Sequence, residues 1–279
     1  MLPPIVRRFV AGTDAPAAIE HVRQCNTDGI GGIVNLLGEH YEHRASADAD
    51  VRLYQDLIRA MDDAGVNGCI SVKPSQIGLG VSREAFEENL SMVIETAQEH
   101  DRFVWIDMED HTTTDATLDA FETHAKATDG AVGVCVQANL KRTAEDLERL
   151  AAIPGKIRLV KGAYDEPPSI AYTSRAAVDD AYRELLEFGF REFDGRIAVG
   201  SHDPAVISLA ADLHAEYGTE YEVQMLMGVR EDAQRELAAA GVPTYQYIPY
   251  GKKWLSYLYR RIRERRSNAL FALRAVLGR

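Results

Sequence analysis

The chain has 279 residues, of which 46% are hydrophobic and 27% are charged, so it can bury a large core in one domain or two small ones. Its formal net charge of −12 argues against broad nucleic-acid binding. We find no apolar run near the ~20 residues of a membrane-spanning helix and no signal-peptide pattern, and therefore expect a cytoplasmic protein. Cys25, Cys69 and Cys135 form no Cys-x-x-Cys pair, which predicts free buried thiols.

Short β-branched runs alternate with amphipathic, charge-rich stretches, with a period of roughly 30 residues. An extra helix at 15–25 comes first, and we expect it to lie across one end of the fold. Strands are expected at 31–37, 69–73, 103–108, 132–137, 158–161, 196–200, 221–226 and 245–248. Helices are expected at 49–64, from the N-cap Ser82, after 114, from 143, at 174–188, at 231–240 and after 251.

Eight βα units in a chain of this size predict a single (βα)8 barrel domain over residues 1–279. An open doubly wound sheet shares the alternation and is the alternative. The Gly-x-Gly-x-x-Gly pattern follows none of the expected strands, which argues against a dinucleotide-binding unit of that kind.

Polar side chains stand at the expected carboxyl ends of nearly all these strands. In a (βα)8 barrel these ends form one mouth, where the chemistry takes place. Packing alone explains such a set poorly, because each charged group costs free energy to desolvate. The sequence therefore predicts a site built from Glu39, Lys73, Asp107, Gln137, Arg158, Lys161, Ser201, His202, Glu222, Gln224 and Tyr247.

The segment from Arg158 to Tyr164 gives the strongest signal. Arg158 and Lys161 stand near the end of an expected strand, where both can reach one ligand although alternation places them on opposite sides. This arrangement indicates an anionic or electron-rich cofactor. Ion pairs with carboxylates of a neighbouring helix are the alternative.

Lys73 and Asp107 close adjacent strands, and we expect an ion pair across the mouth. Because desolvation offsets much of the attraction in a buried pair, substrate orientation explains it better than stability does. A lysine there is also typical of a Schiff-base aldolase, which remains an alternative, and a non-enzymatic ligand-binding barrel is a third. The histidines and carboxylates show no metal-ligand spacing, so no metal is expected.

The final expected helix gives a second signal. Arg260 and Arg261 are neighbours, and two guanidinium groups suit one carboxylate. Beyond Asn268 an apolar face with flanking arginines predicts a helix that docks on the barrel or a partner, with peripheral membrane contact as the alternative.

Four motifs follow one another in chain order: Arg158-Leu-Val-Lys-Gly-Ala-Tyr164, Gln224-Met-Leu-Met-Gly228, Tyr247-x-Pro-Tyr-Gly251 and Arg260-Arg261-x-x-Glu264. Together they resemble the proline dehydrogenase family. The resemblance starts near Val34 and Glu39 and reaches the last helix, and it is to the short monofunctional enzymes rather than the bifunctional proline-utilisation enzymes.

The resemblance implies a distorted (βα)8 barrel that holds FAD, with the last helix above the mouth. It also implies that L-proline is oxidised to Δ1-pyrroline-5-carboxylate, that a membrane quinone takes the electrons, and that a separate pyrroline-5-carboxylate dehydrogenase acts next. The implied catalytic residues are Arg158, Lys73 and Asp107, and Lys73, Asp107, Tyr247, Arg260 and Arg261 would contact proline. The implied FAD-binding residues are Met108, Cys135, Gln137, Arg158, Lys161, Gly162, Tyr164, Ser201, His202, Asp203, Gln224 and Glu264.

Two departures from the family pattern stand out. This chain has Ser201-His202-Asp203 where the family usually has Thr-His-Asn, and Asn35 where an acid is common. The charge of Asp203 is expected to affect cofactor affinity more than proline oxidation.

Overall fold

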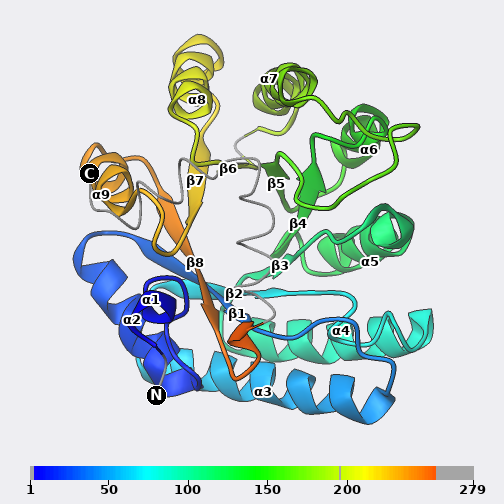
Figure 1. Ribbon diagram of the computed structural model, residues 1–279, viewed down its shortest axis with the longest axis vertical. Coiled ribbons are helices and arrows are strands. Elements are labelled where there is room, and N and C mark those ends of the chain that lie inside the picture. The colour runs from blue at the N-terminus through cyan, green and yellow to red at the C-terminus, as the bar shows by residue number, and fades with distance from the viewer. Residues whose placement is uncertain (1–2, 195, 256–279) are drawn as a thin grey trace.

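A computed structural model describes residues 3–194 and 196–255, and its strands form one closed, parallel barrel in sequence order (Figure 1). Closure is made by β8 on β1, where Ile33 pairs with Tyr247 and Val34 with Ile248. The predicted barrel is therefore confirmed, and the open sheet is wrong. The strands are β1 (Gly31–Leu36), β2 (Gly68–Val72), β3 (Val104–Ile106), β4 (Val132–Gln137), β5 (Lys156–Val160), β6 (Ile197–Gly200), β7 (Tyr221–Leu226) and β8 (Thr244–Tyr250).

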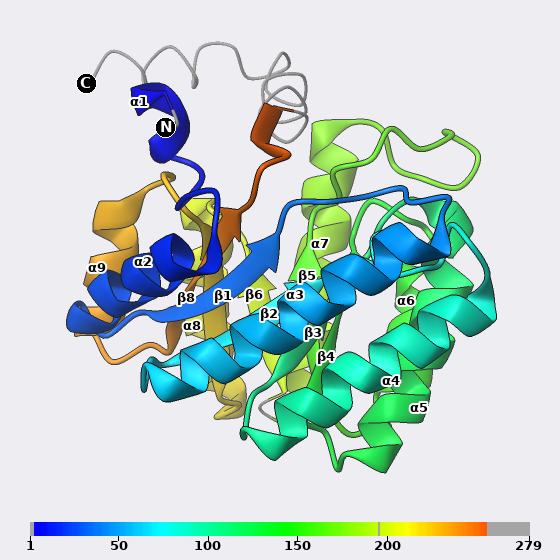
Figure 2. The ribbon, with the colours of Figure 1, turned by 90° about the horizontal axis from the view of Figure 1, so that it is seen from below.

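Helices surround the barrel, as Figures 1 and 2 show. Several begin at side-chain caps: Ser82 accepts from the amide of Ala85, and Ser174 accepts from that of Ala177. The helices are α1 (Pro4–Arg7), α2 (Ala15–Thr27), α3 (Arg44–Asp63), α4 (Arg83–Glu99), the 3-10 turn η1 (His111–Thr113), α5 (Thr114–Ala127), α6 (Thr143–Leu150), α7 (Arg175–Glu192), α8 (Pro204–Tyr217) and α9 (Glu231–Ala239).

The position of α2 corrects one expectation. It packs on the outside of β1 and β8, beside α3, and does not lie across an end of the barrel (Figure 2). Its buried residues Ala18, Val22 and Cys25 form one face, and that face meets glycines on the strands. A Cβ at Gly32 would lie 2.7 Å from Val22 Cγ2, so the glycine permits the close approach.

Two further differences concern helices. We named no helix between the sixth and seventh strands, although eight βα units imply one, and α8 lies there and buries Val206, Ala210 and Leu213. Its start was readable, because Asp203 caps it and Pro204 occupies the first turn. Most of the range expected to be helical after Gly251 falls beyond residue 255 and so outside the described residues, while residues 254 and 255 are helical.

The barrel interior holds both apolar and polar side chains. Ile33, Cys69, Trp105 and Ala198 form a buried cluster inside the barrel, separate from the main core that lies between strands and helices. The inward polar side chains toward the carboxyl ends of the strands form the candidate site.

Candidate functional site at the barrel mouth

Arg158 and Asp107 form a buried ion pair at the centre of the mouth. Arg158 Nη2 donates to Asp107 Oδ1, and the two side chains are 5% and 13% exposed. The guanidinium also lies 4.9 Å from the ring centroid of Trp105 and 5.7 Å from that of Tyr247, which is a cation–π arrangement. Residues at β3 and on β8 therefore hold the cation that β5 supplies.

Asp107 accepts three further contacts. The Tyr247 hydroxyl donates to it at 2.6 Å and that of Ser71 at 2.7 Å, while Lys73 Nζ lies 3.9 Å from its Oδ2. Burial alone would raise the pKa of Asp107, but the charges of Arg158 and Lys73 and these hydrogen bonds outweigh it and hold that pKa below its ordinary value. Asp107 is therefore a fixed negative charge and a poor proton acceptor.

Lys73 is buried, and its ammonium lies near the Asp107 carboxylate. Its Nζ donates to Asn35 Oδ1 at 2.8 Å, and it lies beside the Asp107 carboxylate, as the expected pair requires. A Schiff-base lysine is activated by an apolar pocket or by a nearby cation. Lys73 instead lies beside a carboxylate and an amide oxygen, which argues against the aldolase alternative.

Lys161 has different partners from Arg158. Its ammonium pairs with Asp179 of α7 and, at 3.0 Å, with Asp203 after β6. For Lys161, ion pairing with carboxylates of a neighbouring helix is thus what the structure shows. The two cations do not share one carboxylate.

The segment after β5 has a constrained backbone. Gly162 has φ of +104°, and a Cβ there would lie 2.0 Å from Asn139 Oδ1. The glycine of this motif is therefore required by both conformation and space. Tyr164, two residues on, is half-buried.

The segment after β6 is held against β7. His202 Nε2 accepts the amide of Leu226 at 3.3 Å, and its carbonyl accepts from Arg230 at 2.6 Å. Ser201 is buried, and Asp203 caps α8 in addition to pairing with Lys161. The unusual Asp203 thus has two partners within the protein.

Amide side chains complete the mouth between β4 and β7. Gln137 Nε2 donates to the carbonyl of Glu109 at 2.8 Å, and Gln224 Oε1 accepts from Arg158 Nη1 at 3.0 Å. Met108 and Cys135, which were also expected to contact FAD, are buried. A guanidinium and two amides offer the kinds of donor and acceptor that suit the carbonyl oxygens and ring nitrogens on the polar edge of a flavin, so this set fits such a ring.

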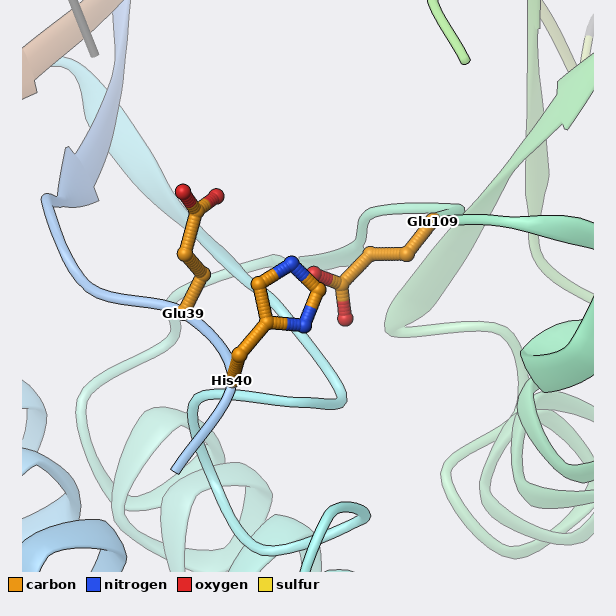
Figure 3. A group of neighbouring side chains, drawn as sticks. All are labelled: Glu39, His40 and Glu109. Atoms are coloured by element: carbon orange, nitrogen blue, oxygen red, sulfur yellow. The ribbon is translucent and has the colours of Figure 1, made fainter. Parts of the chain in front are cut away.

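Figure 3 shows a second group at the mouth, Glu39, His40 and Glu109. Their ligand atoms lie within 4.8 Å of one another. Both oxygens of Glu109 accept hydrogen bonds of 2.7 Å from Ser75, and burial raises the pKa of this carboxyl. Because Glu109 thereby joins two loops of the barrel, we assign the group to loop structure and propose no metal for it.

Sequence reasoning missed several partners. Asn35 was noted only as a departure, whereas it holds Lys73, and Ser71 was not noted although it holds Asp107. Both point inward on their strands, a signal that alternation supplies. The predicted residues Arg260, Arg261 and Glu264 lie outside the described residues.

Comparisons with known proteins agree over nearly the whole chain. A family model described as proline dehydrogenase matches residues 18–274. The proline dehydrogenase of Deinococcus radiodurans is 35% identical over 280 residues, which covers 98% of this chain and 90% of that protein. Proline dehydrogenase 1 of Bacillus subtilis is 33% identical over 274 residues, covering 97% and 90%.

Solved structures show the same fold. Proline utilization A from Bdellovibrio bacteriovorus, inactivated by N-propargylglycine, superposes with a TM-score of 0.86 at 21% identity over 94% of this chain. The protein of the same name from Corynebacterium freiburgense has a TM-score of 0.81 at 23% identity over 98% of this chain. The chain spans 32% of the length of each.

Proposed function

Because this chain belongs to the proline dehydrogenase family and is thereby a flavin-dependent oxidoreductase acting on proline, we propose that its flavin is FAD and its product Δ1-pyrroline-5-carboxylate. The observation that carries the proposal is the buried Arg158–Asp107 pair with Gln224 and Tyr247 around it at the mouth. A flavin supplies a hydride acceptor, which no protein side chain can provide.

The residues of the chain bind and orient the flavin and the substrate. Arg158 offers a fixed positive charge to an electron-rich ring, and it stabilises negative charge that develops there. Lys73 and Asp107 present charges of both signs to a substrate that itself carries an amine and a carboxylate. Tyr247 contributes an apolar wall for the proline ring, and Arg260 and Arg261, beyond residue 255, bind the carboxylate.

The acceptor and the cellular setting belong to the same proposal. Electrons pass to a quinone, which resides in a membrane, so the protein works on the cytoplasmic side with peripheral contact to that membrane. Among the described helices, none combines the length and apolar character needed to cross a bilayer. A separate pyrroline-5-carboxylate dehydrogenase consumes the product.

A spectroscopic experiment tests the proposal. Purified protein should be yellow, and its flavin absorption should bleach when L-proline is added without oxygen. Acid extraction followed by chromatography should release FAD rather than FMN. A colourless protein that forms a borohydride-trapped adduct with a carbonyl substrate would contradict the proposal and support the aldolase alternative.

A further inference from the structure

We propose that Glu222 is a positioning residue for proline oxidation, which fixes the Gln224 amide and, through it, the Arg158 guanidinium. The proposal rests on the proposed function, because the place of Arg158 matters to the reaction only where a flavin binds beside it. Glu222 stands on β7, two residues before Gln224 and on the same inward face.

A line of hydrogen bonds crosses the barrel interior toward the mouth. Lys156 Nζ donates to Glu222 Oε2 at 2.5 Å, and Gln224 Nε2 donates to Glu222 Oε1 at 2.6 Å. Gln224 Oε1 then accepts from Arg158 at 3.0 Å, and Arg158 donates to Asp107. Two layers result, with Lys156 and Glu222 below and Arg158 and Gln224 above.

Small residues on the intervening strand allow these layers to form. β6 lies between β5 and β7, and its inward positions are Ala198, in register with Arg158 and Glu222, and Gly200, in register with Gln224. A Cβ at Gly200 would lie 3.4 Å from Arg158 Cγ. Long side chains of β5 can therefore reach those of β7 across β6.

The donors and acceptors in this line permit one amide orientation. A carboxylate only accepts hydrogen bonds, and a guanidinium only donates them. Gln224 lies between the two, so its NH2 must face Glu222 and its oxygen must face Arg158. A reversed amide would set two donors against each other at Arg158 and two acceptors at Glu222. Glu222 therefore determines which end of Gln224 the arginine meets.

Packing does not require this carboxylate. Barrel interiors are usually filled by branched apolar side chains, and a buried ion pair is weak evidence for stability. The Glu222 side chain is 8% exposed, and its charge is compensated by Lys156 at the amino end of β5. The buried Glu222 carboxylate lies next to Gln224, which in turn bonds Arg158, and this is where a positioning role requires it.

Two substitutions of Glu222 separate the effect of its side-chain length from the effect of its charge. Glu222→Asp keeps the charge but shortens the side chain, so it no longer spans from Lys156 to Gln224. Glu222→Gln keeps the reach and an acceptor oxygen but removes the charge. The first measurement is the ratio of reduced to oxidised FAD at a fixed solution potential set by a redox dye. The others are the FAD content of the protein and its kcat and KM for L-proline.

We expect Glu222→Asp to lower the reduced-to-oxidised ratio about tenfold, which is about 30 mV for a two-electron couple. A displaced Arg158 stabilises the reduced flavin less, so kcat should fall while KM changes little. Glu222→Gln should stay within about threefold of wild type. In a Gln224→Leu background, Glu222→Asp should add no further shift, because Glu222 acts through that amide.

Gln246→Asn is the matched control. It shortens another buried side chain by one methylene, on β8, where Gln246 bonds with Gln234 at 2.8 Å and His21 at 2.6 Å, away from the Arg158 line. It should lower the melting temperature and leave the flavin ratio unchanged. If the ratio of reduced to oxidised FAD does not shift in Glu222→Asp, or shifts in Glu222→Gln and not in Glu222→Asp, the positioning role of Glu222 is wrong and the proposed function still stands. Wild-type protein without bound flavin overturns the proposed function as well.

Discussion

Asp107 and Tyr247 illustrate how single side chains divide the work at the mouth. Asp107 is held ionised by Arg158 and Lys73, so it contributes charge rather than proton transfer. Burial and then the charge of Asp107 raise the pKa of Tyr247 well above its ordinary value, so its hydroxyl stays protonated and donates to Asp107. The ring is fixed by its own hydrogen bond, which makes it a rigid wall.

This wall predicts substrate preference. A fixed aromatic ring leaves little room for a hydroxyl on the proline ring, so we expect a clear preference for proline over 4-hydroxyproline. Tyr247→Ser should narrow the ratio of the two kcat/KM values about tenfold, which is the size of effect that pocket shape gives. The ratio is the quantity to measure, because loss of active enzyme cancels.

Tyr247→Phe is the matched control for that prediction. It keeps the ring and removes the 2.6 Å hydrogen bond to Asp107, so both kcat/KM values should fall while their ratio stays. If Tyr247→Ser only lowers stability and leaves the ratio unchanged, Tyr247 is a core aromatic and does not determine specificity.

At the scale of elements, the segment between β5 and α7 is joined to its neighbours by backbone contacts. The amide of Lys141 donates to the carbonyl of Ile170 at 2.9 Å, and the amide of Tyr172 to that of Asn139 at 2.8 Å. Glu166, which is buried, accepts from the amide of His111 at 2.9 Å. Gly162 stands at the start of this segment, which also carries Lys161 and Tyr164, expected to bind FAD, so a change at Gly162 should disturb cofactor binding.

Gly162→Ala should therefore reduce flavin retention. The new methyl group would lie 2.0 Å from Asn139 Oδ1, and alanine would also have to adopt an unfavourable positive φ. Gly65→Ala is the control, because Gly65 has φ of +59° with nothing within 4 Å of its Cβ position, so it carries only the backbone cost of about 1–2 kcal/mol. The flavin-to-protein ratio after gel filtration should fall in the first variant alone. Equal ratios in both would show that the loop tolerates the collision.

At the scale of the whole molecule, the sequence predicted architecture better than contacts. Eight periodic units were enough for the barrel, and strand-end polarity was enough to find the mouth. The Lys73–Asp107 pair was predicted because the two residues end adjacent strands. The partnership of Tyr247 and Asp107 was not, because they are 140 residues apart and meet only when the barrel closes. The same holds for Lys161, whose carboxylate partners depend on how α7 and the segment after β6 pack.

The seam between β8 and β1 is the clearest case of such a global feature. A regular βα repeat expects the helix after the last strand to cover this seam, whereas α2 covers it from the N-terminal side. Periodicity alone gives a helix before the first strand but not its position. The small residues Gly32 and Gly68, in register on β1 and β2, were the readable signal of a close helix approach.

This role of α2 predicts that the seam contributes to the stability of the entire barrel. Val22 is fully buried, and its two methyl groups are the atoms nearest to the place where a Cβ on Gly32 would stand, at 2.7 and 2.9 Å, with Ile248 Cδ1 next at 3.2 Å. Val22→Ala should lower the free energy of unfolding by about 2 kcal/mol, through lost burial and an uncollapsed cavity. The control is Gln24→Ala on the exposed face of the same helix, which should stay within about 0.5 kcal/mol of wild type.

Urea unfolding followed by both far-ultraviolet circular dichroism and flavin release should give one coincident transition in each protein. A Val22→Ala variant as stable as the control, or one in which α2 unfolds in a separate earlier transition, would show that the barrel closes without this helix.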